Sequence, residues 1–177
     1  MHTQVEFAAK HFGMMTVRGR FNDVQTSGSV DPAHPESSQI EVTIDVASLN
    51  THNAQRDNDL RSSYFLELDK YPTITFKSTR IEPAGQDRYT LTGDLTIKGK
   101  TKSVTLNMLR YGELNDPGMM GHRIAYSAEA EIDRRDFGLT FNTLLDGRWA
   151  VGDNVAINIE LELVEQTQEQ EAAATSG

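Results

Sequence analysis

The chain has no cysteine and no long apolar run. Without cysteine, its 177 residues cannot form a disulfide, a thiolate metal site or a cysteine nucleophile. A membrane-spanning helix needs about 20 apolar residues, and every apolar stretch of the chain is much shorter. This predicts a protein without stable membrane insertion. The length suits one domain of ordinary size, and such a domain can bury a core without covalent cross-links.

Basic residues are scarce relative to acidic ones. The 17 Lys and Arg residues against 26 Asp and Glu residues give a formal net charge of −9. An acidic surface repels phosphate backbones, so we expect no nucleic-acid partner. Residues 1–12 hold no apolar stretch typical of a signal peptide. This predicts a cytoplasmic protein, or a periplasmic or secreted one if the sequence is that of a processed form.

Alternation of apolar and polar residues dominates the sequence and predicts half-buried antiparallel strands. The clearest example is Ile40, Val42, Ile44 and Val46. The other runs share this period of two and lie at residues 5–9, 17–30, 74–76, 89–97, 104–108, 124–132 and 155–163. Within residues 17–30 the phase slips by one residue, which predicts a β-bulge near Asn22 and Asp23.

Eight candidate strands predict a mainly β fold, a single eight-stranded antiparallel barrel with one short helix. Turn-forming sequences separate the strands, among them 31–35, 98–100 and 115–118. A two-sheet sandwich is the alternative architecture. We assign the barrel domain to residues 1–165 and expect the polar, Ala-rich tail at 166–177 to be disordered.

Residues 53–66 break the alternation and contain several helix formers. Asn53 is a candidate N-cap, and Asp57 lies in the first turn, where negative charge is favoured. This predicts one short helix that covers an end of the barrel or packs on its side, followed by an irregular turn before Pro72.

Residues able to catalyse a reaction or bind a metal are scattered along the chain. Asp57 and Asp59 lack the glycine and the distal glutamate of a calcium loop. No nucleophile elbow, P-loop or dinucleotide fingerprint is present. The five histidines are isolated and lack metal-ligand spacing: His2, His11, His34, His52 and His122. We therefore predict no enzyme activity, no metal and no cofactor.

Large apolar side chains between the strands exceed what alternation explains. They include Leu49, Leu60, Phe65, Phe137 and Phe141. One interpretation is ordinary core that plugs the barrel ends. The other is the lining and portal of a ligand cavity.

Motifs from about residue 2 to residue 164 resemble, in their order and spacing, the YceI-like family of lipocalin-like, polyisoprenoid-binding barrels. They include Val17-Arg18-Gly19-Arg20-Phe21, Ser48-Leu49-Asn50-Thr51, Arg56-Asp57, Tyr71-Pro72-Thr73-Ile74-Thr75-Phe76, Gly93-Asp94-Leu95-Thr96-Ile97-Lys98-Gly99-Lys100 and Arg134-Arg135-Asp136-Phe137-Gly138. One departure is Asp59, which stands where the family commonly has a histidine.

The resemblance implies a lipocalin-like barrel that binds, transports or stores a long apolar lipid without catalysis. Its ligand would be a polyprenyl phosphate, an isoprenoid quinone or a fatty-acid-like molecule. The residues expected to line the tail site are Phe7, Phe21, Ile44, Phe76, Leu95, Leu106 and Tyr126 on strands, with Leu49, Leu60, Phe65, Phe137 and Phe141 closing it. The candidate headgroup contacts are Arg56, Arg61 and His11.

Several alternatives stay open at this point. Arg56 and Asp57 would equally suit a buried ion pair that locks the helix to the strands. A filled barrel would act as a scaffold or a stress-associated interaction protein without a lipid. An enzyme acting on a lipophilic substrate would need His11 or an aspartate as general base, and the sequence offers no arranged partner for it. The expected partner is an apolar small molecule, and a homodimer is left open.

Overall fold

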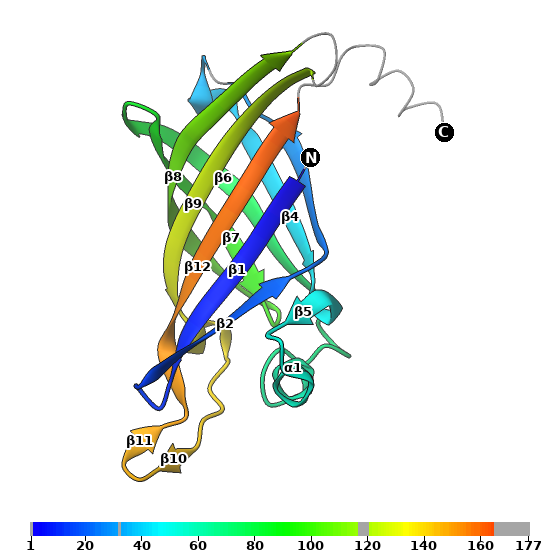
Figure 1. Ribbon diagram of the computed structural model, residues 1–177, viewed down its shortest axis with the longest axis vertical. Helices are drawn as coiled ribbons and strands as arrows, with labels where there is room; N and C mark the ends of the chain where they lie inside the picture. The colour runs from blue at the N-terminus through cyan, green and yellow to red at the C-terminus, as the bar shows by residue number, and fades with distance from the viewer. Residues whose placement is uncertain (1, 32, 117–120, 165–177) are drawn as a thin grey trace.

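A computed structural model describes residues 2–31, 33–116 and 121–164 (Figure 1). The predicted tail at 166–177 lies outside the described residues. The long strands are β1 (His2–His11), β2 (Met15–Phe21), β3 (Val24–Ser29), β4 (Gln39–Asp45), β6 (Thr73–Gly85), β7 (Arg88–Ile97), β8 (Lys100–Asp116), β9 (Gly121–Asp133) and β12 (Val151–Val164). The short elements are η1 (Pro35–Ser37), η2 (Val46–Ser48), β5 (Leu49–Asn50), α1 (Ala54–Arg61), η3 (Arg134–Phe137), β10 (Leu144–Leu145) and β11 (Arg148–Trp149).

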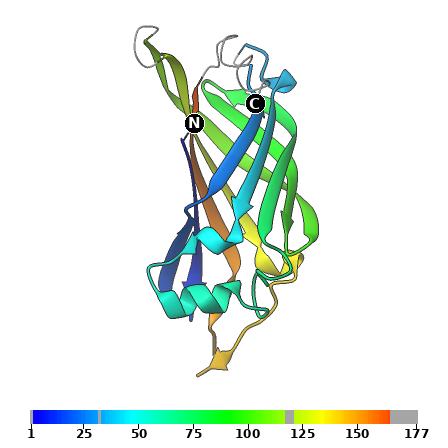
Figure 2. The same ribbon diagram turned by 90° about the vertical axis from the view of Figure 1, so that its right-hand side faces the viewer.

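The strands of the described residues form one curled antiparallel sheet and a separate small hairpin. The order in the large sheet is β3-β4-β6-β7-β8-β9-β12-β1-β2-β5, and β10 pairs with β11. The curved wall surrounds an interior, with α1 lying at one end (Figures 1 and 2). The mainly β, antiparallel, lipocalin-like architecture with one helix is confirmed, and the sandwich is not.

Two strands at opposite ends of this order are neighbours along the chain. β2 pairs with β1 and β3 pairs with β4, while only Asn22 and Asp23 separate β2 from β3. The structure has a bend between two strands where the sequence predicted a β-bulge, and this bend lets one run of residues turn from one neighbouring strand to another. With β2 and β3 taken as one bent strand and the two-residue β5 set aside, the sheet has the eight strands that alternation predicted.

A tight turn sets the register of β7 and β8. Lys98 and Gly99 both have positive φ, at 50° and 70°, and Ile97 pairs with Lys100 across them. Two consecutive residues with positive φ form the hairpin turn whose twist matches that of its strands. Glycine fits the second position because it has no Cβ to clash.

The helix begins where the sequence predicted and is shorter than the segment that suggested it. The Asn53 side chain accepts a hydrogen bond from the Arg56 backbone N–H at 3.0 Å, and the helix ends at Arg61. None of the helices in the described part of the chain is long and apolar enough to cross a membrane.

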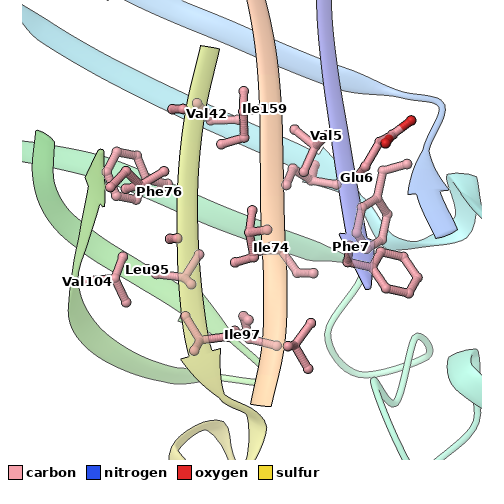
Figure 3. Close-up of a pocket in the computed structure, with 18 of the residues that line it drawn as sticks. Val5, Glu6, Phe7, Val42, Ile74, Phe76, Leu95, Ile97, Val104 and Ile159 are labelled. Atoms are coloured by element: carbon pink, nitrogen blue, oxygen red, sulfur yellow. The ribbon is translucent and has the colours of Figure 1, made fainter. Parts of the chain in front are cut away.

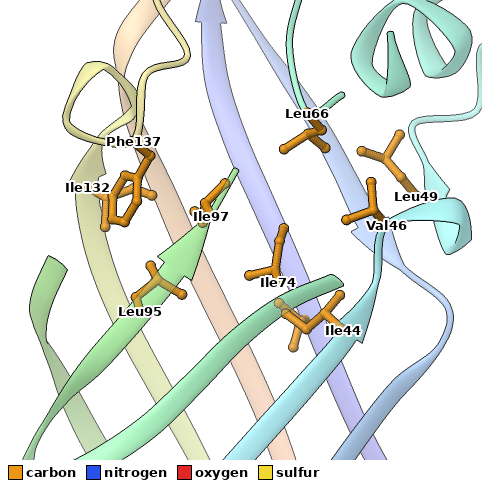
Figure 4. Close-up of a cluster of buried hydrophobic side chains, with 10 residues drawn as sticks. Ile44, Val46, Leu49, Leu66, Ile74, Leu95, Ile97, Ile132 and Phe137 are labelled. Carbon is orange, nitrogen blue, oxygen red and sulfur yellow. The ribbon is translucent and has the colours of Figure 1, made fainter. Parts of the chain in front are cut away.

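The most deeply buried apolar side chains lie near the helical end of the barrel. Val46, Leu49 and Phe137 are nearly inaccessible there, and they pack among buried residues of the strands (Figure 4). This packing joins η2, β5 and η3 to the barrel wall, so the segments that close this end are held by apolar contact.

Candidate functional site

A cavity of about 220 Å³ runs inside the barrel, and the surface it exposes is apolar. Side chains from β1, β4, β6, β7 and β12 converge on it (Figure 3). Its lining reaches from Thr3 and Thr26 near one end to Leu66 and Leu139 near the other. The cavity therefore follows the length of the barrel.

Strand alternation explains why the lining is apolar. Phe7 lies opposite Gly19 and Ile157 in its two ladders, and Phe76 lies opposite Leu95. Residues directly opposite in an antiparallel ladder share one face of the sheet. Each apolar run thus turns the same face inward, while the intervening polar residues face solvent.

Two glycines make room for the aromatic rings on the inner face. A Cβ added at Gly19 would lie 2.4 Å from the Phe7 ring, and one added at Gly93 would lie 2.4 Å from the Phe76 ring. Each ring therefore lies against the bare backbone of a neighbouring strand rather than across the cavity. Phe7 also contacts Phe21, with ring centroids 5.6 Å apart.

The structure places most of the predicted tail-site residues on the cavity. These are Phe7, Phe21, Ile44, Leu60, Phe65, Phe76, Leu95, Leu106 and Tyr126. The other three lie elsewhere: Leu49 and Phe137 are 2% and 1% exposed within the core cluster. Phe141 is 41% exposed and stacks its edge on Phe65.

The predicted headgroup contacts are not among the cavity-lining residues. Arg56 donates to the Thr51 hydroxyl and carbonyl, both at 2.8 Å. Arg61 donates to the Leu49 carbonyl, and its Nε is buried without a hydrogen-bond partner. His11 is exposed, and its Nδ1 donates to the Ala150 carbonyl at 2.8 Å.

Arg56 and Asp57 anchor the helix by a different contact from the ion pair considered above. The buried Asp57 carboxylate accepts from the Thr51 backbone N–H at 2.9 Å and from its hydroxyl at 2.6 Å. Thr51 is therefore the residue on which both side chains of α1 converge.

Arg134 lines the cavity and was not predicted to do so. Its side chain is 4% exposed, and burial lowers the pKa of its guanidinium while Asp153 opposes that shift. It donates to the carbonyls of Leu139, Phe141, Val151 and Gly152 and to the Asp153 carboxylate. These acceptors match its five N–H donors, so Arg134 ties chain segments together. The sequence gives no sign of this role, because the acceptors are mostly backbone carbonyls and any basic residue after a strand looks the same.

Aromatic pairs lie at both ends of the cavity. Tyr126 meets Tyr89 edge to face with centroids 6.4 Å apart, and burial raises the pKa of the Tyr126 phenol. Both tyrosines also line a small adjoining pocket with Asp31 and Ser38. At the other end Phe141 contacts Phe65, which links the loop after α1 to the segment after η3.

Within residues 2–31, 33–116 and 121–164, no cluster of three or more His, Asp or Glu side chains could hold a metal ion. The arrangement offers an apolar interior and a single lining guanidinium that is already engaged. Chemically, it suits burial of a hydrocarbon chain.

Known proteins with similar sequences belong to one family. The YceI-like domain matches residues 1–163. A UPF0312 protein of Pseudomonas paraeruginosa is 40% identical over 138 residues, which cover 78% of this chain and 71% of that protein. A UPF0312 protein of Pectobacterium carotovorum is 38% identical over 139 residues, again covering 78% and 71%.

Solved structures share the fold. BcnA of Burkholderia cenocepacia superimposes with a TM-score of 0.80 at 26% identity, covering 92% of this chain and 96% of that one. The Campylobacter jejuni YceI protein gives 0.75 at 32% identity, covering 89% and 90%. A polyisoprenoid-binding domain of Saccharophagus degradans gives 0.61 at 17% identity, covering 90% and 92%, a likeness of fold alone.

Proposed function

Because the chain belongs to the YceI-like family, we propose that it binds a long apolar lipid inside its barrel and carries or stores it without catalysis. The observation that carries this proposal is the apolar cavity along the barrel axis. A filled barrel, the alternative interpretation, would place side chains where this cavity lies.

The physical chemistry of the lining favours a hydrocarbon ligand. Transfer of each methylene from water to an apolar interior contributes about 0.8 kcal/mol. A prenyl or acyl chain therefore gains affinity along its whole length, without polar contacts placed for it. The solved polyisoprenoid-binding domain supports an isoprenoid as the ligand class only through its similar fold.

An uncharged headgroup suits the described lining better than a phosphate. Among the cavity-lining residues that the structure describes, Arg134 is the only basic one, and protein oxygens already accept from its donors. A buried phosphate without a free cationic partner is strongly unfavourable. We therefore favour an isoprenoid quinone or alcohol over a polyprenyl phosphate.

The test is native mass spectrometry of the freshly purified protein, followed by organic extraction of any bound compound. We expect a stoichiometric mass excess that extracts as a neutral prenyl lipid. Delipidated protein should regain such a mass after incubation with a quinone. A mass that stays at the apo value after both steps would overturn the proposal.

A variant that fills the cavity tests the site of binding, and the same substitution on the outer face of the sheet is its matched control. Ala130 lines the cavity, whereas Ala156 lies opposite Ala8 and Glu131, on the outer face of the sheet. We expect Ala130→Trp to abolish the mass excess while Ala156→Trp retains it. Equal retention in two folded variants would place the ligand outside the barrel.

A further inference from the structure

Large apolar side chains project from the helical end of the barrel. Met14, on the turn between β1 and β2, is 63% exposed, and Met15, the first residue of β2, is 68% exposed. The β10–β11 hairpin exposes more than half of Leu144, Leu145 and Trp149. We call these five residues the apolar tip. The hairpin extends beyond the barrel as its narrowest part (Figures 1 and 2).

A tight turn shapes the hairpin that carries three of the five tip residues. Asp146 and Gly147 have φ of 48° and 71°, which forms a tight two-residue hairpin turn. Leu144 pairs directly with Trp149, so both side chains lie on one face of the hairpin.

Hydrogen bonds of three residues, Phe12, Arg134 and Asn142, hold the hairpin to the barrel. The Asn142 amide binds both backbone groups of Val151, at 2.7 and 2.9 Å. The Ala150 carbonyl accepts from the Phe12 N–H at 3.2 Å, which joins the β1–β2 turn to the hairpin. Arg134 binds the carbonyls on either side of the excursion. The hairpin is therefore hydrogen-bonded to the barrel at its base, while its apolar side chains stay exposed to solvent.

The segment that carries the hairpin begins and ends at the cavity. Leu139 and Val151, which flank the hairpin in sequence, both line the cavity. Phe141, which precedes the hairpin, contacts the lining residue Phe65. The base of the hairpin therefore lies at the cavity.

Charge on the segments that form the tip is nearly balanced, although the chain carries −9. The basic residues of 10–15 and 134–153 are Lys10, Arg134, Arg135 and Arg148, and the acidic ones are Asp136, Asp146 and Asp153. The acidic excess of the chain thus lies outside these segments, and they can approach a lipid headgroup region without strong repulsion.

We propose that the apolar tip inserts into the interface of a lipid bilayer, where the protein collects or releases the ligand of its cavity. Docking is inferred from the exposed residues of the apolar tip alone, whereas the exchange of ligand rests on the function proposed above. Exposed Trp and Leu side chains such as those of the hairpin are the residue types with which interfacial segments bind lipid. The five residues of the apolar tip are few beside the about 20–30 residues per side of a standard protein interface. Insertion into lipid needs no complementary surface.

The chain contains one tryptophan, Trp149, so its fluorescence reports the tip directly. We would mix delipidated protein with phosphatidylcholine vesicles and follow Trp149 emission and co-sedimentation. We expect emission to shift to shorter wavelength and to be quenched by phosphatidylcholine brominated on its acyl chains. Partition should fall about ten-fold or more in Leu144→Ser/Leu145→Ser, because two apolar side chains leave the membrane.

Leu114→Ser is the matched control, because Leu114 is also a leucine about half exposed, at 47%, and lies at the far end of β8. It should partition as the parent does. Unchanged emission and no co-sedimentation would overturn the proposal. A second result would also overturn the proposal: Trp149 emission that is blue-shifted without vesicles and returns on dilution, with a dimer in sedimentation velocity. A second copy of the chain would then cover the tip.

The two proposals fail in different ways. Ligand retention is measured by mass spectrometry without vesicles, so Leu144→Ser/Leu145→Ser should keep a mass excess in that experiment. A protein that retains lipid and ignores vesicles would contradict docking alone. A protein that binds vesicles and never retains lipid would contradict the carrier function alone.

Discussion

At the scale of single residues, Thr51 decides how the helix is attached. Its backbone N–H and hydroxyl both donate to Asp57, and its hydroxyl and carbonyl accept from Arg56. The buried Asp57 carboxylate thus depends on one threonine for two hydrogen bonds. The sequence shows these residues as one motif. It does not distinguish an ion pair between Arg56 and Asp57 from hydrogen bonds of both residues to Thr51.

Thr51→Val keeps the side-chain shape and removes the hydroxyl. We expect a loss of about 2–3 kcal/mol in the free energy of unfolding, because a buried carboxylate loses a donor. Urea denaturation followed by circular dichroism would measure it. Thr96→Val removes an exposed hydroxyl that bonds Thr101 at 2.7 Å. It should cost less than about 0.5 kcal/mol. Equal losses would contradict the role assigned to Thr51.

Gly19 controls the position of Phe7. In Gly19→Ala the new methyl would lie 2.4 Å from the Phe7 ring and 2.7 Å from the Thr51 methyl. Both of them have to move, and we expect a loss of about 1–3 kcal/mol in the free energy of unfolding with reduced lipid retention. Phe7→Leu in the same chain should restore part of the stability, which a double-mutant cycle detects. Strictly additive losses would show that the ring is not the obstacle.

At the scale of elements, prediction succeeded where a run of residues carried a period. The slip between Phe21 and Val24 located the bend between β2 and β3, and Lys98-Gly99 marked a turn. The strands β10 and β11 have two residues each, too few for any period to show. Their hairpin depends on Arg134, whose partners are backbone carbonyls that the sequence does not identify.

Arg134→Met tests whether this guanidinium holds the hairpin. We expect faster amide hydrogen exchange across residues 138–150 and a loss of about 2–4 kcal/mol in the free energy of unfolding, because buried carbonyls lose their donors. Arg135→Met is the neighbouring control, since Arg135 is exposed and pairs with Asp133 and Asp153. It should cost less than about 1 kcal/mol. Hydrogen exchange that rises equally in both variants would mean that the hairpin is held by other contacts.

At the scale of the whole molecule, the fold was predictable and the cavity was not. Alternation of Ile40, Val42 and Ile44 requires an apolar inner face, and a filled barrel and a hollow one require the same face. Whether space remains depends on where each ring lies. Phe7 and Phe76 rest on glycines of neighbouring strands, a relation between distant parts of the chain. Leu49 and Phe137 likewise became core because β5 and η3 fold onto the barrel end.

A ligand enclosed by the barrel must stabilise the whole domain, because the unfolded chain has no cavity to hold it. At free ligand one hundred times the dissociation constant, linkage adds about 2.7 kcal/mol. For a domain of this size that corresponds to a rise of about 5–10 °C in Tm. Calorimetry of delipidated protein, before and after addition of a quinone, would measure it. Ala130→Trp should show no rise, while Ala156→Trp should match the parent. A complex seen by mass spectrometry with no rise in Tm would mean that the lipid binds the unfolded chain equally well, which an interior site does not allow.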